Sequence, residues 1–364
     1  MKRIRTLGVT VLLTLVIVSC GGGGGGDGVV LPPPPPLAID QNNAMPVAAA
    51  VLDAMAIVMD LGSGSVVPPV PLAAAAEDAS ASTPTLTGII RDQAERFTLL
   101  QEPPAMVQIA AVVIPPTPYD CVTGTFTISG EIADETGTLL TPGDTISITF
   151  FNCDQGDGLV LNGKLALVVV TGVDTDFTPP YDFTFDTTLT NFSVTELASG
   201  ESFTANGDLT LREAVTADGL FTETEASGNK LTAAVDGETE TLKDYWIRGT
   251  LSAAANAYTA ESSGLSDCCA TLESTALGGS VDFENIEIFM GVGDNYPYAG
   301  DLFITGATVL VGSGNTSVEL VAMMDELCVN LLVDEDGDGV VDAGITTTWE
   351  SLPTGIPDAC VIQP

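Results

Sequence analysis

Apolar and polar residues alternate with a period of two over most of the chain after Tyr119. Short apolar runs are separated by Gly, Asp and Asn clusters, and long helical interruptions are missing. The clearest runs are Phe126-Ile128, Ile146-Ile148-Phe150, Leu165-Leu167-Val169, Phe183-Phe185, Leu209-Leu211, Leu302-Ile304 and Val318-Leu320. A period of two places alternate side chains on opposite faces of a strand. Residues 117–364 are therefore predicted to form a large curved antiparallel β-sheet, a meander of about a dozen strands in which sequence neighbours pair.

Residues 40–116 show helical spacing instead. A first helix is predicted from Asn43 to Gly62 because a set of apolar residues shares one helix face: Val47, Val51, Met55 and Val58. Asp53 lies off that apolar stripe. A second helix is predicted from Ile90, Ala94, Phe97 and Leu100, and Pro103-Pro104 end it. The predicted fold class is mainly β (α+β), with two N-terminal helices packed on the sheet.

Three similar segments interrupt the alternation of the sheet. Each has a polar residue between apolar runs of opposite phase, at Asn191, Asp244 and Asn285. A β-bulge has this effect because one extra residue re-aims the side chains after it. Three equivalent bends are expected, and the alternative is that these polar residues line a site.

The first residues are typical of an export signal. Lys2, Arg3 and Arg5 precede the apolar stretch Leu7–Val18, which is shorter than the roughly 20 residues that span a bilayer. The run Ile17-Val18-Ser19-Cys20 resembles a bacterial lipobox. That resemblance implies cleavage of residues 1–19 and attachment of lipid (palmitate among the acyl chains) to Cys20. An ordinary secretory signal is the alternative.

Residues 20–39 are predicted to be a tether. Gly21–Gly26 and Pro32–Pro36 are nearly pure in composition and cannot form a core, so a flexible part is followed by a stiff polyproline part. In lipoproteins, Gly rather than Asp after the lipidated Cys is typical of outer-membrane proteins. Gly21 thus places the expected anchor in the outer membrane, on the periplasmic or the surface face.

Composition excludes several kinds of function. The chain has 10 Lys and Arg against 49 Asp and Glu, a net charge of -39 and no His. The lack of His rules out Ser-His-Asp catalysis and His-ligated metals, and the acidity argues against a nucleic-acid partner. Ser227 and Lys230 match a Ser-x-x-Lys spacing but lie in a Gly/Asn turn without companion motifs. The chain is therefore not expected to be an enzyme, and a glycan-directed enzyme that uses a pair of carboxylates is the third alternative.

Six cysteines follow Cys20. An even number in an exported protein favours disulfides, although six cysteines allow 15 pairings. Two pairs that bracket β segments of similar length are favoured, Cys121 with Cys153 and Cys328 with Cys360. Cys268 and Cys269 are adjacent, so they form either a vicinal bridge or separate bonds with other partners.

The segment Asp334–Asp342 is the strongest local motif. Acidic residues and a Gly recur as they do in a Ca²⁺-binding loop, and the candidate ligands are Asp334, Asp336, Asp338, Asp342 and the carbonyl of Val340. Ile345 stands where an EF-hand has its bidentate Glu, and strand-like residues flank the loop. A calcium-stabilised hairpin is expected. A bare hairpin, whose Asp-Gly pairs serve only the turn, is the alternative.

The order of these features resembles a group of uncharacterised proteobacterial lipoproteins. After the lipobox and tether, the resemblance rests on Asn43-Ala44, Cys121, Gly143-Asp144-x-Ile146-x-x-x-Phe150, Asn152-Cys153, Tyr296-Pro297, Thr305-Gly306-Ala307 and Thr348-Trp349-Glu350-Ser351-Leu352. It covers most of the mature chain and implies architecture and location, but no activity.

The expected function is that of a lipid-anchored outer-membrane protein with a non-catalytic binding or envelope structural role. Its expected contacts are the membrane, through the lipid, and an envelope protein. The alternative is a carrier that holds a lipid or another apolar ligand between the helices and the sheet. Long apolar strands and the apolar segment Met106–Ile114 motivate it.

Overall fold

The computed structural model describes residues 33–58, 86–100, 112–132, 140–172, 177–200, 202–235, 237–266, 268–293, 296–308 and 314–360. The expected signal, Cys20 and residues 20–32 of the expected tether lie outside these ranges. So do Gly62 and Pro103-Pro104, the expected helix ends.

Antiparallel strands dominate the fold, as the sequence predicted. The helices are α1 Ala44–Val58, α2 Leu86–Leu100 and the short 3-10 helix η1 Trp349–Thr354. The strands are β1 Val112–Asp120, β2 Thr123–Ile132, β3 Thr145–Asp154, β4 Leu159–Thr171, β5 Tyr181–Glu196, β6 Ser202–Val215, β7 Phe221–Val235, β8 Glu238–Ser252, β9 Ala257–Gly264, β10 Ala270–Ser274, β11 Gly279–Val292, β12 Ala299–Thr308, β13 Asn315–Ala322, β14 Cys328–Asp334 and β15 Ala343–Thr348.

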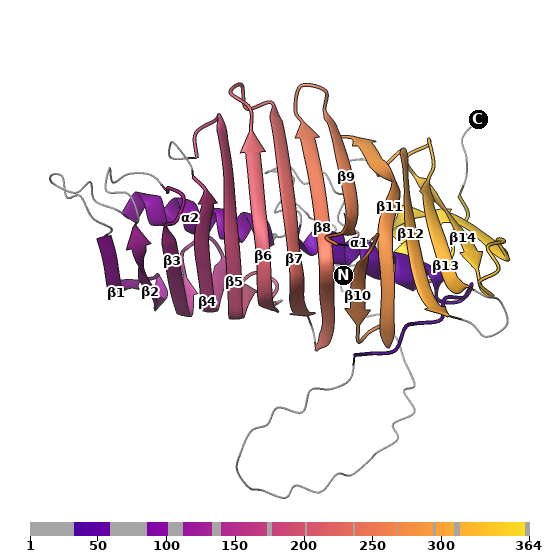
Figure 1. Ribbon diagram of the computed structural model, residues 1–364, viewed down its shortest axis with the longest axis horizontal. Helices are drawn as coiled ribbons and strands as arrows, with labels where there is room; N and C mark the ends of the chain where they lie inside the picture. The colour runs from indigo at the N-terminus through magenta and orange to yellow at the C-terminus, as the bar shows by residue number, and fades with distance from the viewer. Residues whose placement is uncertain are drawn as a thin grey trace, which may run out of the picture. The chain divides into compact units, whose positions relative to one another are not determined.

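All 15 strands belong to one sheet, in which sequence neighbours pair from β1 to β8 and again from β10 to β15. The exception lies in the middle. Both β9 and β10 pair with β8 and with β11, so these two short strands follow one another in a single lane of the sheet. Figure 1 shows them one above the other between β8 and β11. The meander is thus continuous, with one interrupted strand.

One boundary differs from the sequence prediction. The helical segment was expected to reach residue 116, but β1 already begins at Val112. Pro115 and Pro116 lie inside this strand, where the register with β2 shifts. Proline has no N–H to give to a ladder and is therefore confined to edge strands and bulges, which is the position of β1 at the end of the strand order.

The helices lie behind the sheet in Figure 1, and the strands present their other face to the viewer. α1 contacts η1 and strands β8, β10, β13 and β14. α2 reaches β6, where the Arg91 guanidinium lies 3.5 Å from the Glu213 carboxylate. Pro34–Pro364 group into one compact unit, so helices and sheet belong together. Among the described residues, none of the helices is long and apolar enough to cross a bilayer.

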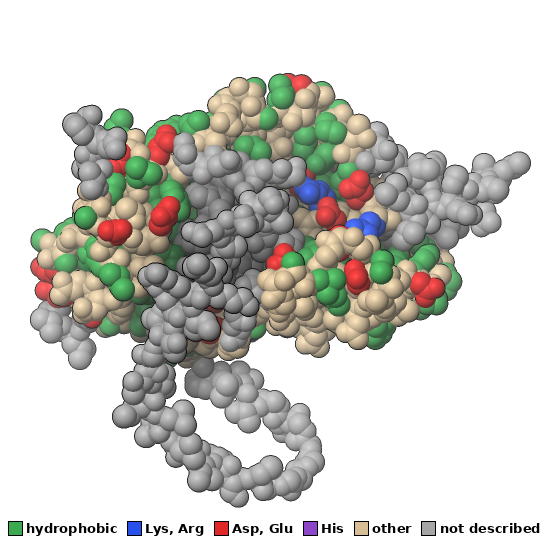
Figure 2. Space-filling view, turned by 180° about the vertical axis from the view of Figure 1, so that it is seen from behind, with side chains coloured by type: hydrophobic (Ala, Val, Ile, Leu, Met, Phe, Trp, Pro, Cys, Tyr) green, Lys and Arg blue, Asp and Glu red, His purple; other side chains and the backbone are tan. Residues whose placement is uncertain are grey.

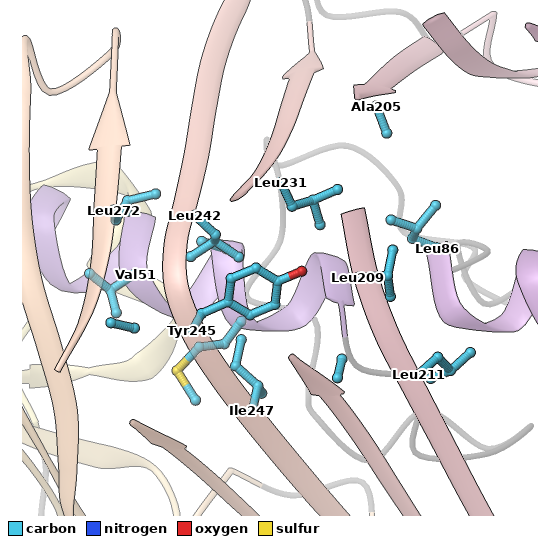
Figure 3. Packing of buried hydrophobic residues seen from close by; sticks show 14 of the residues in the cluster. Val51, Leu86, Ala205, Leu209, Leu211, Leu231, Leu242, Tyr245, Ile247 and Leu272 are labelled. Carbon is cyan, nitrogen blue, oxygen red and sulfur yellow. The ribbon is translucent and has the colours of Figure 1, made fainter. Parts of the chain in front are cut away.

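The core fills the space between the helices and the sheet. Alternate residues of the strands, such as Phe183 and Phe185, are fully buried. Figure 3 shows Val51 of α1 on the side of Leu272 and Leu242, and Leu86 of α2 on the side of Leu209 and Leu231, all within one buried cluster. The period-two pattern of the sequence therefore identified the face that the helices cover.

The three expected bends are not equivalent. Asn191 has a positive φ of 46° and sits where the register between β5 and β6 shifts, as expected of a bulge. At Asn285 the register of β11 with β12 shifts. Asp244 has a positive φ of 52°, but the register of β8 with β7 continues across it. Instead, Asp244 marks the point where β8 changes its partner from β10 to β9.

A further bulge lies at Asn152 in β3, with φ 48° and a register shift to β4. It has the same construction as the bulge at Asn191. The backbone N–H of Asn152 donates to Oδ1 of Asn162 at 2.7 Å, and the N–H of Asn191 donates to Oδ1 of Asn206 at 2.6 Å. A glycine follows each acceptor, and a Cβ on Gly163 would lie 2.0 Å from the carbonyl oxygen of Asn191. The sheet therefore needs glycine at this close approach.

Asp53 lies off the apolar stripe of α1, a position that suggested an exposed side chain. In the structure this residue is half-buried. Its Oδ1 atom is buried and has no hydrogen-bond partner among the described residues. Burial, and then the nearby Glu240 carboxylate of β8, raise the pKa of Asp53 to about 7. Burial, and then Glu238, likewise raise the pKa of Glu240 to about 7. Two acids whose pKa is raised by burial therefore lie at the junction of α1 and the sheet.

Candidate functional site

The Asp-rich segment forms the loop of the hairpin that joins β14 to β15. Asp334, at the end of β14, is 8% exposed and organises the loop. Its two carboxylate oxygens accept backbone N–H groups of Gly337 at 2.7 Å and Gly339 at 2.8 Å. Both glycines have positive φ, 71° and 83°. The Asp-Gly repeats thus serve the turn, as the bare-hairpin alternative requires.

The same turn brings three carboxylates together. Asp334, Asp336 and Asp338 each have an oxygen within 4.8 Å of the other two. Two oxygens bound to one Ca²⁺ at about 2.4 Å each are at most about 5 Å apart. The loop packing around Asp336 and the neighbouring Asp338 carboxylate raise the pKa of Asp336. These three acids have the spacing of a shared cation shell.

The other two expected ligands are not in that group of three. The carboxylate of Asp342 accepts the backbone N–H of Glu335 at 2.9 Å. The backbone N–H of Val340 donates to Asp338 Oδ1 at 2.8 Å, and the Val340 side chain is exposed. The structure therefore brings together three of the five residues that the sequence singled out.

The loop also holds the start of α1. The Glu335 carboxylate accepts the backbone N–H of Gln41 at 2.9 Å. The carboxylate of Asp40 accepts the N–H of Asn42, and the side chain of Asn43 accepts the N–H of Asp40. Sequence reasoning missed the contact between residues 41 and 335, since nothing local in either segment points to it.

The last residues of the expected tether are bound to the sheet. Leu37 donates its N–H to the Ser280 carbonyl at 2.8 Å, and its own carbonyl accepts the Ala307 N–H at 2.7 Å. The N–H of Ile39 donates to Thr316 Oγ1 at 2.9 Å. Residues 37–39 thus contact β11, β12 and β13 in turn. The contact is close, because a Cβ on Gly306 would lie 2.2 Å from the Leu37 carbonyl oxygen.

The six cysteines form three disulfides in the structure. Cys121 is bonded to Cys153 and Cys328 to Cys360, the pairs that the sequence favoured. Cys268 is bonded to Cys269, which decides between the two alternatives for that pair. The first two bonds each join residues 32 positions apart, and a loop of that size stabilises a fold by about 3–4 kcal/mol. The vicinal bond closes too small a loop for such a contribution.

A charged ladder crosses the sheet from β5 to β9, on the face opposite the buried side chains of Phe183, Leu211 and Ile247. Arg212 of β6 bonds Asp182 of β5 at 2.9 Å and Glu223 of β7 at 2.5 Å. Arg248 of β8 bonds Glu223 at 2.7 Å and Glu261 of β9 at 3.1 Å. The Arg248 hydrogen bond, opposed by partial burial and helped by Arg212, lowers the pKa of Glu223. The part of this ladder on β5, β6 and β7 borders an open groove of about 700 Å³, which Tyr181 and Phe221 also line. Sequence reasoning missed both features because the residues come from separate strands.

The helix-covered face carries no broad basic region among the described residues. Figure 2 shows this face, on which the few basic groups in view lie beside acidic ones. Arg96 of α2 likewise forms an ion pair with Asp157 at 2.9 Å.

The described contact between α1 and the sheet leaves little room for a ligand. The cavity next to Ala54, Leu231 and Glu240 measures about 10 Å³, no more than one water needs. This observation does not favour the carrier alternative, which stays a prediction.

Comparison with known proteins adds no relative: no family model, no curated protein and no solved structure matches the chain. The interpretation of the site therefore rests on its geometry and chemistry.

Proposed function

We propose that the chain is an outer-membrane lipoprotein, held by lipid at Cys20, with a non-catalytic binding or envelope structural role. The cysteine pairing carries this proposal. The six later cysteines are bonded to one another, so Cys20 has no cysteine of the same chain left as a partner. Disulfides also persist mainly outside the cytosol, which fits an exported protein.

The binding of residues 37–39 supports an anchored role. A lipid at Cys20 holds the chain from its N-terminal side, so a force from the membrane first reaches residues 35–37, where the Ser280 N–H donates to the Pro35 carbonyl at 3.1 Å. There the hydrogen bonds to Ser280 and Ala307 pass the load to β11 and β12. Because α1 packs on the same sheet, a force applied at these hydrogen bonds acts on the whole sheet and not on one strand alone.

Fractionation of cells that express variants tests the anchor. Cys20→Ser is expected to leave the membrane fraction and to lose incorporation of labelled palmitate. The matched control is Cys268→Ser/Cys269→Ser, which removes two cysteines without touching the signal and is expected to stay in the membrane. Membrane retention and labelling of Cys20→Ser equal to wild type would refute the proposal.

We further propose that Ca²⁺ stabilises the hairpin loop at Asp334, Asp336 and Asp338. The support is the spacing of their oxygens together with the acidity of the chain, since a divalent cation offsets local repulsion. Asp342 and the Val340 carbonyl are the further ligands that the sequence suggests.

Thermal unfolding with Ca²⁺ and with a chelator tests this site. Ca²⁺ is expected to raise the Tm of wild type but not that of Asp336→Asn/Asp338→Asn. Asp334 is left intact because its bonds to Gly337 and Gly339 hold the turn whether or not an ion binds. The control variant Glu131→Gln/Glu238→Gln also loses two negative charges, but from exposed positions away from the loop. Its Tm is expected to rise with Ca²⁺ as much as the Tm of wild type. An equal shift in all three proteins would argue against the site.

A further inference from the structure

The Cys268–Cys269 disulfide occupies an unusual place in the sheet. It lies in the segment that interrupts the lane shared by β9 and β10, between the continuous strands β8 and β11 (Figure 1). Cys268 is exposed and Cys269 half-buried, whereas Cys153 and Cys328 of the other two disulfides are fully buried. Of the three disulfides, Cys268–Cys269 is therefore the most accessible to a reagent in solution.

The backbone around this disulfide is held without help from the sulfur atoms. The N–H of Leu265 donates to the Asp244 carbonyl at 2.9 Å, and the N–H of Gly264 donates to the Cys268 carbonyl at 3.3 Å. The Ser266 hydroxyl donates to the Asp244 carboxylate at 2.9 Å. β9 and β10 are each paired on both sides. Opening the S–S bond therefore leaves the anchors of the loop in place.

The Cys268–Cys269 disulfide also contributes little to stability as a cross-link. It joins adjacent residues, while each of the other two joins residues 32 positions apart. Stabilisation by a cross-link grows with the length of chain that it closes. A bond that adds little stability, and whose loss leaves the strands paired, is suited to opening and closing in the native protein.

Glu284 supplies a third ligand atom beside the two sulfurs. A carboxylate oxygen of this β11 residue and the two Sγ atoms lie within 4.8 Å of one another. Two thiolates on neighbouring residues form a compact donor pair for a soft metal ion. The carboxylate comes from the next lane of the sheet, so its position does not depend on the S–S bond.

We propose that Cys268 and Cys269 form a redox-active site that a dithiol reductant opens in the folded protein, and that the resulting dithiol binds a thiophilic metal ion together with Glu284. In the opening step, a thiolate of the reductant attacks one sulfur and the S–S bond breaks. The second thiol of the reductant then attacks the reductant sulfur of the mixed disulfide, so that the bond to the second cysteine breaks and this cysteine leaves as a thiol. Two electrons and two protons pass to the cysteines, and the reductant becomes a disulfide.

Graded reduction of the native full chain tests the opening step. The protein is treated with increasing dithiothreitol without denaturant, alkylated with iodoacetamide and analysed as peptides by mass spectrometry. Two alkyl groups are expected on Cys268 and Cys269 at a reductant concentration that leaves the other four cysteines unmodified and the circular dichroism unchanged. Reduction of either other disulfide at a lower concentration, or loss of the β signal with the first bond, would overturn the proposal.

Phenylarsine oxide and Cd²⁺ test the dithiol as a binding site. The arsenical joins two neighbouring thiols with release of water, so one equivalent is expected on the selectively reduced protein and none on the oxidised protein or on reduced Cys268→Ser. Cd²⁺ is expected to give the ultraviolet thiolate charge-transfer band on the reduced protein, with weaker affinity in Glu284→Gln. Glu284→Gln is expected to bind the arsenical as wild type does, which controls for folding. Lack of either ligand on the reduced protein, or Cd²⁺ affinity unchanged in Glu284→Gln, would contradict the assigned metal site.

Discussion

Replacing Asp53 by Asn is expected to reduce the pH dependence of stability. The pKa of Asp53 is raised from 3.8 to about 7 in the native protein. Between these values the unfolded chain releases the proton while the folded chain keeps it, so stability falls as pH rises and levels off above the folded pKa. Below the unfolded pKa both states are protonated, and the group has no effect.

The size of the effect follows from the shift. About three pH units at about 1.4 kcal/mol each give roughly 4 kcal/mol as an upper bound, and partial exposure of the carboxyl reduces this to about 2 kcal/mol. Asn has the same shape without the charge. It remains a buried amide, just as the protonated acid is a buried polar group, so the slope with pH is the quantity to compare.

Thermal or urea unfolding from pH 5 to pH 8 measures that slope. Wild type is expected to lose stability with rising pH, and Asp53→Asn to lose less. The pKa of Glu240 is also raised to about 7, so Asp53→Asn/Glu240→Gln is expected to be flatter still. Glu131→Gln, at an exposed position of β2, controls for the overall negative charge. The reasoning is refuted if Asp53→Asn and Glu131→Gln have the same slope.

Two further predictions concern the anchoring segment and the cross-links. Gly306→Ala places a Cβ 2.2 Å from the Leu37 carbonyl oxygen, so hydrogen exchange of the Ala307 N–H should accelerate; Gly344→Ala, with open space around the new Cβ, should leave it unchanged. Cys121→Ser/Cys153→Ser should lower the free energy of unfolding by about 3–4 kcal/mol, whereas Cys268→Ser/Cys269→Ser should lower it much less; equal losses would contradict the loop-length argument.

The sequence was sufficient to predict the parts of the fold that depend on local periodicity. Phe183 and Phe185 alternate with polar neighbours and are buried, and the strands pair in sequence order up to β8. The bulge at Asn191 was readable because the apolar phase flips there. The one at Asn152 was missed because its neighbours Phe151 and Cys153 hide the flip.

Features that depend on contacts between distant segments could not be predicted from the sequence. The raised pKa of Asp53 depends on its burial against the sheet and on the charge of Glu240, which is far away in sequence, whereas the helix pattern alone placed Asp53 off the apolar stripe. The interrupted lane of β9 and β10 depends on β8 and β11 together. For the acidic loop, sequence spacing identified Asp334, Asp336 and Asp338, but the separate role of Asp342 as acceptor for Glu335 needed the turn geometry.

The mass of the N-terminal peptide, taken from protein in its own membrane, tests the central claim most directly. The account predicts a mature chain that starts at Cys20 and carries a diacylglyceryl group on its sulfur and a further acyl chain on its amine. An intact Met1 terminus, or a Cys20 without lipid on protein recovered from a soluble fraction, would contradict it.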